Sequence, residues 1–205
     1  ANLAESERYP NVDWDEALFK DFAPSYNANL NISGGSEFVK YFAGADFQYE
    51  GDLIRQYNNS RGYQPGFNYN RFNVRTNLDF QLTPSTVLKV GLSGSYGVRK
   101  TPWGFNGGQY VYWIAAYSTP PDIYLPQYSD GTWGYDAPSG GGEGNAIRNL
   151  AISGVQYLTT TQLQTNFTLE QKLDVIAKGL TFNGTIALDN TFIEANRGVN
   201  DLFND

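Results

Sequence analysis

The most constraining feature of this chain is a strict alternation of apolar and polar residues that recurs in six segments. In the third segment, for example, Phe72 and Val74 alternate with Arg71 and Arg75. Successive side chains of a β-strand point to opposite sides, so each segment predicts a strand with one apolar face and one polar face. The six predicted strands cover residues 26–33, 39–50, 70–82, 88–99, 161–173 and 180–189.

Strand length indicates what the apolar face contacts. Strands of soluble domains average about 5–6 residues, whereas a tilted strand that crosses a bilayer has about 9–11. Tyr41 and Tyr49 mark the ends of one apolar face, and about 26 Å of strand between them gives about 20 Å of height after tilting. We therefore predict an all-β fold, an antiparallel transmembrane β-barrel segment. The alternative is a large β-sandwich in which these aromatic residues form an ordinary core.

The same parity assigns residues to the two sides of the predicted barrel wall. Phe42 is the one apolar residue that falls on the polar side of its segment. The predicted lipid-facing residues are Phe47, Phe72, Val74, Leu78, Phe80, Leu92 and Phe167. The predicted lumen-facing residues are Arg71, Arg75, Asp79, Gln164 and Glu170.

The connections between predicted strands alternate in length. Residues 34–38, 83–87 and 174–179 form short connections, whereas 51–69 and 100–160 are long. Bacterial outer-membrane barrels place short turns in the periplasm and long loops outside the cell. We therefore predict one domain, residues 1–205, with extracellular segments at 1–24, 100–160 and 190–205. Asp13 predicts the N-cap of a short helix that runs to Lys20.

Composition excludes several classes of function. The chain has no Cys, His or Met, which removes thiol nucleophiles, Ser-His relays and the usual zinc and haem ligands. A net charge of −7 argues against nucleic-acid binding. We predict no catalytic residues, no metal site and no cofactor. No helix-sized apolar run is present, and six strands are too few to close a barrel, so we expect a partial polypeptide.

One long loop is the predicted site of ligand contact. Residues 101–135 hold ten aromatic residues and only two charged ones, Asp122 and Asp130. Aromatic faces and neutral hydrogen-bonding groups suit sugars or peptides. The alternative is that most of these rings pack the loop upon itself. The predicted substrate contacts are Trp103, Tyr110, Trp113, Tyr124, Trp133 and Tyr135.

The amino-acid sequence of the strands and loops resembles that of SusC/RagA-type TonB-dependent outer-membrane transporters. Five matching segments follow in order: YPNVDWDEALFK, YNANLNISGGSEFVKYFAGADFQYEGD, FNYNRFNVRTNLDFQLTPSTVLKVGLSGS, STPPDIYLPQYSDGTWG and LEQKLDVIAKGLTFNGTIALDN. The resemblance implies a barrel of about 22 strands with an N-terminal plug, a SusD-like surface lipoprotein over it, and energy supplied through TonB. No plug or TonB-binding segment is recognisable here, so the chain corresponds to early barrel strands.

These observations predict a protein of the bacterial outer membrane that breaks no bond. We expect TonB-dependent import of a nutrient, an oligosaccharide or glycan fragment, together with a SusD-like lipoprotein. The expected partners are this lipoprotein, TonB through a region outside the chain, outer-membrane lipid, and an oligosaccharide or peptide substrate, with no nucleic acid. The alternatives are a passive porin and a soluble carbohydrate-binding β-domain.

Overall fold

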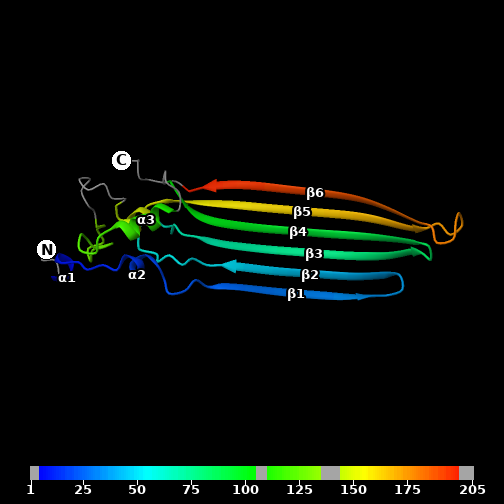
Figure 1. The fold of residues 1–205 in the computed structure, drawn as a ribbon, viewed down its shortest axis with the longest axis horizontal. Helices are drawn as coiled ribbons and strands as arrows, with labels where there is room; N and C mark the ends of the chain where they lie inside the picture. The colour runs from blue at the N-terminus through cyan, green and yellow to red at the C-terminus, as the bar shows by residue number, and fades with distance from the viewer. Residues whose placement is uncertain (1–4, 105–109, 135–143, 199–205) are drawn as a thin grey trace.

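The computed structural model of the chain describes residues 5–104, 110–134 and 144–198. Six antiparallel strands form one sheet in which each strand pairs with its neighbours in sequence (Figure 1). The strands are β1 (Ser25–Gly35), β2 (Val39–Glu50), β3 (Asn68–Thr83), β4 (Thr86–Trp103), β5 (Gly154–Lys172) and β6 (Thr181–Arg197). The three short hairpin turns lie at one end of the sheet, the turn end, and the long loops lie at the other, the loop end.

Strand register aligns the six separate alternations into two continuous faces. Phe47 pairs with Phe72, and Phe72 pairs with Tyr96 on the next strand. Val90 pairs with Phe167 in the same way. Opposite residues of paired strands lie on one side of the sheet and their side chains touch. The predicted lipid-facing residues therefore share one side, the apolar face, and the predicted lumen-facing residues share the other, the polar face.

β4, β5 and β6 each extend at least four residues further towards the loop end than the alternation predicts. Residues 100–103, 154–160 and 190–197 belong to strands, so the predicted loop boundaries at 100, 160 and 190 are wrong. The backbone ladder continues there, with Thr160 paired to Ile193 and Gln156 to Arg197. Side-chain parity does not continue, because Glu194 now lies on the apolar face and Ile193 on the polar face. The alternation of apolar and polar residues stops where the apolar band ends, whereas the backbone hydrogen bonds between the strands continue beyond it.

Four short helices gather at the loop end (Figure 1). They are α1 (Glu5–Arg8), α2 (Trp14–Leu18), α3 (Tyr110–Ser118) and α4 (Ala146–Ala151). We call these helices, with the described parts of the loops between β2 and β3 and between β4 and β5, the cap. Among the described residues, no helix combines the length and apolar character that crossing a bilayer requires.

The predicted N-cap of α2 is confirmed. The Asp13 carboxylate accepts hydrogen bonds from the backbone N–H groups of Asp15 and Glu16, each at 3.1 Å. The helix ends at Leu18, two residues before the predicted end, because Phe19 is extended and forms a β-bridge with Ile54. This bridge attaches α2 to the loop that follows β2.

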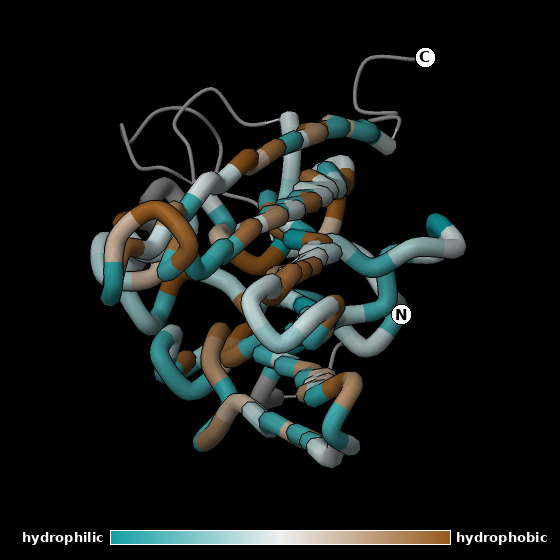
Figure 2. Tube along the Cα trace, turned by 90° about the vertical axis from the view of Figure 1, so that its right-hand side faces the viewer, coloured by the Kyte–Doolittle hydropathy of each residue, from teal (hydrophilic) through white to brown (hydrophobic). Residues whose placement is uncertain are grey.

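The main hydrophobic core lies in the cap and not against the sheet. Its buried members are Trp14, Leu18, Ile54, Tyr112, Ala116, Tyr124, Ala146, Ile147 and Leu150. By contrast, strand residues such as Leu30 and Ile186 are 72% and 67% exposed. Figure 2 shows hydrophilic and hydrophobic positions interspersed along the strands in a view from the turn end. The sheet therefore presents an apolar face that no part of the described chain covers.

Candidate functional site

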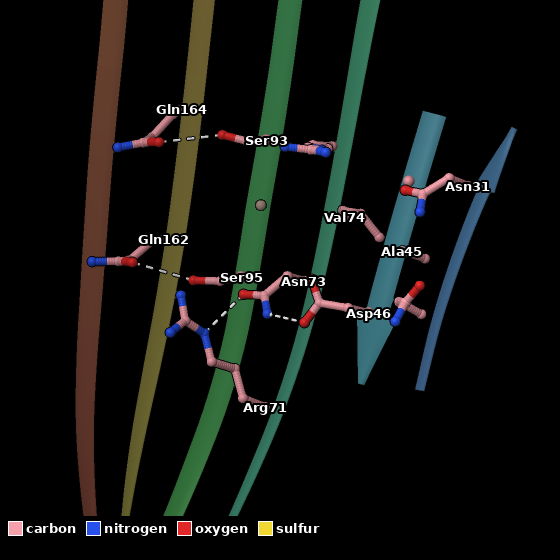
Figure 3. A pocket seen from close by; sticks show the side chains of 14 residues that line it. Asn31, Ala45, Asp46, Arg71, Asn73, Val74, Ser93, Ser95, Gln162 and Gln164 are labelled. Atoms are coloured by element: carbon pink, nitrogen blue, oxygen red, sulfur yellow. Dashed lines mark hydrogen bonds between the residues drawn. The ribbon is translucent and has the colours of Figure 1, made fainter. Parts of the chain in front are cut away.

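The polar face contains a hollow in the middle of the sheet, which we call the polar trough (Figure 3). Its volume is about 410 Å³, and β1 to β5 all contribute to its lining. The polar side chains that line it are Asn29, Asn31, Asp46, Arg71, Asn73, Arg75, Ser93, Ser95, Gln162 and Gln164. Amides, hydroxyls and guanidinium groups bind by donating and accepting hydrogen bonds. The trough can therefore hold a hydrophilic ligand or a polar protein segment.

Hydrogen bonds between strands order these side chains. Ser93 Oγ donates to Gln164 Oε1 and Ser95 Oγ donates to Gln162 Oε1, both at 3.2 Å (Figure 3). Each bond engages the carbonyl oxygen of a glutamine and leaves the amide nitrogen available for another acceptor. The two pairs lie side by side along the strands, so the amide nitrogens of Gln162 and Gln164 form two neighbouring donors.

The predicted lumen-facing residues fall into two groups along the polar face. Arg71, Arg75 and Gln164 line the polar trough. Asp79 and Glu170 lie near the turn end, where they line a separate hollow of about 210 Å³. The Glu170 carboxylate accepts a 2.6 Å bond from Lys89 Nζ. The sheet therefore brings all five residues to its polar face. It stays a prediction that this face borders the lumen of a barrel.

Two of the predicted substrate contacts are packing residues of the cap. Tyr124 is 3% exposed and meets the Trp14 ring edge-on at 5.5 Å between centroids. Trp133 is partly buried, packs against the core, and lies edge-on to Tyr57 at 6.4 Å. For Tyr124 the prediction of a ligand contact is wrong, because its ring completes the core. Both residues fit the alternative interpretation of the sequence, in which most aromatic rings of this loop pack within the protein.

The remaining aromatic candidates differ in their surroundings. Trp103 ends β4, and the Arg197 guanidinium lies 5.3 Å from the centre of its ring. Trp113 on α3 is 41% exposed and stacks on Phe19 at 4.5 Å. Tyr110 is the first residue of α3, and Tyr135 lies outside the described residues. Ligand contact stays a prediction for Trp103, Tyr110, Trp113, Trp133 and Tyr135.

Polar anchors hold the cap together, and sequence reasoning did not find them. Arg55 Nε donates to the carbonyl oxygens of Glu16 at 2.7 Å and Phe19 at 2.8 Å. The Tyr57 hydroxyl donates to Ala17 O at 2.8 Å, and burial raises the pKa of this phenol. Asn145 is buried and caps α4. Asn is a favoured N-cap residue, so Asn145 directly before α4 is a sequence signal that could have identified this cap.

Comparison with known proteins relates this geometry to a family. No family model matches the sequence. The TonB-dependent receptor P26 of Formosa agariphila (strain DSM 15362 / KCTC 12365 / LMG 23005 / KMM 3901 / M-2Alg 35-1) is 33% identical over 146 residues, which cover 71% of this chain. The structure of the RagAB peptide transporter matches with a TM-score of 0.64 at 20% identity and covers 91% of this chain. The predicted resemblance to SusC/RagA-type TonB-dependent transporters is confirmed.

The matched SusC/RagA-type proteins are much longer than this chain. The chain spans 13% of the length of the Formosa receptor and 20% of the matched transporter chain. The fold match confirms the predicted all-β segment of a larger antiparallel barrel. One matched protein is named a receptor and the other a transporter, and neither is named an enzyme.

Proposed function

We propose that the full-length protein imports a nutrient across the bacterial outer membrane in a TonB-dependent manner. The observation that carries this proposal is the two-faced sheet. Its apolar face runs through all six strands in register and is exposed, and the opposite face forms the polar trough. Similarity to a TonB-dependent receptor and to a transporter supports the energised mechanism.

Lipid is the proposed neighbour of the apolar face. Phe72, Leu92 and Phe167 are 46%, 42% and 40% exposed, although each is large and apolar. Covering such a side chain contributes about 1.5–3 kcal/mol relative to leaving it in water. A bilayer covers all of them at once, because a spanning barrel carries its apolar band on the outside.

The cap lies on the proposed extracellular side, where long loops of outer-membrane barrels occur. The nutrient is an oligosaccharide, glycan fragment or peptide, and its proposed contacts are Trp103 at the end of β4 and Trp113 in the cap. A SusD-like lipoprotein is the proposed partner on this side. TonB engages a region outside the chain.

Uptake by intact cells tests the proposal. Cells that carry the full-length protein should take up labelled oligosaccharides or peptides from a complex digest, and loss of TonB should abolish this uptake. A passive porin is the second candidate, because a polar trough of this kind also suits a water-filled channel. Uptake that persists without TonB would support the porin and refute the proposal.

Site-directed labelling tests the assignment of the two faces. A spin label at Leu78 should be accessible to lipid-soluble oxygen, and a label at Asp79 should be accessible to a water-soluble nickel chelate. These residues are adjacent in β3 and point to opposite sides. The reverse pattern would contradict the proposed orientation of the sheet.

A further inference from the structure

Within the described part of the chain, two arginines of the polar trough form no ion pair. Among the residues that the structure describes, the one ion pair is that between Lys89 and Glu170 near the turn end. Arg71 and Arg75 lie in the middle of β3, and neither has a described carboxylate within 4.0 Å. A guanidinium group remains charged at every physiological pH, so both positions carry a permanent positive charge.

Neighbouring side chains fix both guanidinium groups. Arg71 Nε donates to Asn73 Oδ1 at 2.8 Å, and Asn73 Nδ2 donates to Asp46 Oδ2 at 2.6 Å (Figure 3). These two hydrogen bonds orient Arg71 and use only its Nε–H. The N–H groups of its two terminal nitrogens stay available to a ligand. The Arg75 guanidinium lies 4.8 Å from the centre of the Phe42 ring, which explains an aromatic residue on the polar face. Cation–π contact holds a guanidinium group without occupying its donors.

Several residues opposite the two arginines are small. Arg75 is opposite Gly44 on β2 and Ser93 on β4, and Arg71 is opposite Gly97 on β4. A Cβ atom at Gly44 would lie 2.6 Å from the Asn31 side-chain oxygen, so this position tolerates no larger residue without a shift. Gly44 and Ser93 line the polar trough, Gly97 lines one neighbouring hollow, and Ser93 also lines another.

The hollows form a path along the polar face. Arg71 lines both the 410 Å³ trough and a hollow of about 270 Å³ nearer the loop end. Arg75 lines both the trough and a hollow of about 390 Å³ on the other side. The arginines are four residues apart on one strand, which places their Cα atoms about 13 Å apart at about 3.3 Å per residue. That separation suits an extended oligomer and exceeds the reach of a single small acid.

We propose that Arg71 and Arg75 form a binding subsite for cargo that carries carboxylate groups on more than one unit. This inference rests on the proposed import function and names the chemical class of the cargo. Each guanidinium donates two parallel hydrogen bonds to one carboxylate, and such charge-assisted bonds are about twice as strong as neutral ones. The amide nitrogens of Gln162 and Gln164 donate to the neutral oxygens of the same oligomer.

Calorimetry with two matched probe pairs tests the subsite in the purified full-length transporter. One pair is tetragalacturonate and its methyl ester, and the other is tetraglutamate and tetraglutamine. In at least one pair the acidic probe should bind about tenfold or more tightly than its neutral counterpart, and added salt should reduce the preference. Arg71→Gln and Arg75→Gln should each remove most of it. The pair that responds identifies a sugar or a peptide as the source of the carboxylates.

Lys89→Gln is the matched control, because it removes a positive charge from the same face at a residue that already has an ion-pair partner. The preference for acidic probes should survive this substitution. The subsite is refuted if neither acidic probe binds more tightly than its neutral counterpart. It is also refuted if Lys89→Gln weakens binding as much as Arg75→Gln does.

Two further readouts separate the subsite from other roles of these residues. If Arg71→Gln and Arg75→Gln lower the melting temperature of the empty transporter without changing probe preference, the arginines pair with carboxylates elsewhere in the full-length protein and the subsite is wrong. TonB-dependent uptake of neutral cargo alone would reject the subsite and leave the import function standing. Loss of TonB dependence in the unmodified protein would reject the import function itself.

Discussion

Replacing Asn145 should loosen the cap in a way that its geometry specifies. This side chain is 3% exposed and makes four hydrogen bonds. Its Nδ2 donates to Pro126 O at 2.8 Å and to Gly134 O at 2.9 Å. Its Oδ1 accepts from the backbone N–H groups of Ile147 at 3.1 Å and Arg148 at 3.0 Å. Both donors and both acceptor positions of the amide are therefore in use.

Asn145→Asp keeps the shape and the acceptor oxygen but replaces the donor nitrogen with a second oxygen. Two buried carbonyl groups then lose their partner, at about 1–3 kcal/mol each, so we expect the cap to lose about 2–6 kcal/mol of local stability. Asn145→Ala should cost about 1 kcal/mol more, because it also removes the N-cap of α4.

Hydrogen exchange of the full-length protein measures this loss. Protection factors of amides in residues 126–134 and 147–153 should fall about 30-fold for a loss of about 2 kcal/mol. Asn58→Asp is the control, because the exposed Asn58 side chain accepts one bond from Ser60 N and an aspartate preserves it. Protection that is unchanged in Asn145→Asp would refute the assigned role of the two donor bonds.

The pH dependence of the same variant provides a second check. Burial and two facing carbonyl oxygens should raise the folded-state pKa of the new carboxyl group above its unfolded value. A group of this kind favours the folded cap below the unfolded pKa, and that contribution is lost as pH rises through the folded pKa. Asn145→Asp should therefore be better protected at pH 5 than at pH 8, and the opposite order would contradict the mechanism.

Three further predictions concern the cap core and the apolar face. Leu18→Ala should cost about 2–5 kcal/mol of local stability and speed proteolysis in the cap, because Leu18 is fully buried in the core. Burial raises the pKa of Tyr112 to about 12, so the cap should lose stability as pH rises from about 10 through about 12. Tryptophan fluorescence should report this loss, and Tyr112→Phe should remove it. Leu78→Arg should destabilise the full-length protein in lipid vesicles by about 2–4 kcal/mol if Leu78 lies near the bilayer midplane, whereas Asp79→Asn on the polar face should cost far less in urea titrations.

The two faces of the sheet were predictable because they depend on local parity alone. Phe72 and Arg71 lie on opposite sides in any strand, whatever its partners are. Strand ends were less predictable, since the ladder at Ile193 persists after the alternation has stopped. The backbone pairs without regard to side-chain polarity, and sequence patterns report only the side chains.

The cap core was not predictable from local pattern. Trp14 and Tyr124 contact each other across 110 positions of sequence, and neither lies in a long amphipathic helix. Tyr124 therefore looked like an available ring in an aromatic loop. The polar trough could be anticipated only in part. Parity places Arg71 and Arg75 on one face, but whether a carboxylate lies beside them depends on what β2 and β4 bring there, and among the described residues neither arginine forms an ion pair.

The composition of the cap core has a consequence for the order of assembly. Its residues come from before β1, from between β2 and β3, and from between β4 and β5, and Trp14 Nε1 donates to Pro120 O across 106 positions. Each hairpin can form from neighbouring residues, but contacts this distant must await closure of the intervening chain. A one-residue slip in any intervening pair would turn the apolar residues of that strand to the wrong side. The cap core can consolidate only after the four strands between Trp14 and Leu150 are aligned, so its formation marks the completion of that part of the sheet.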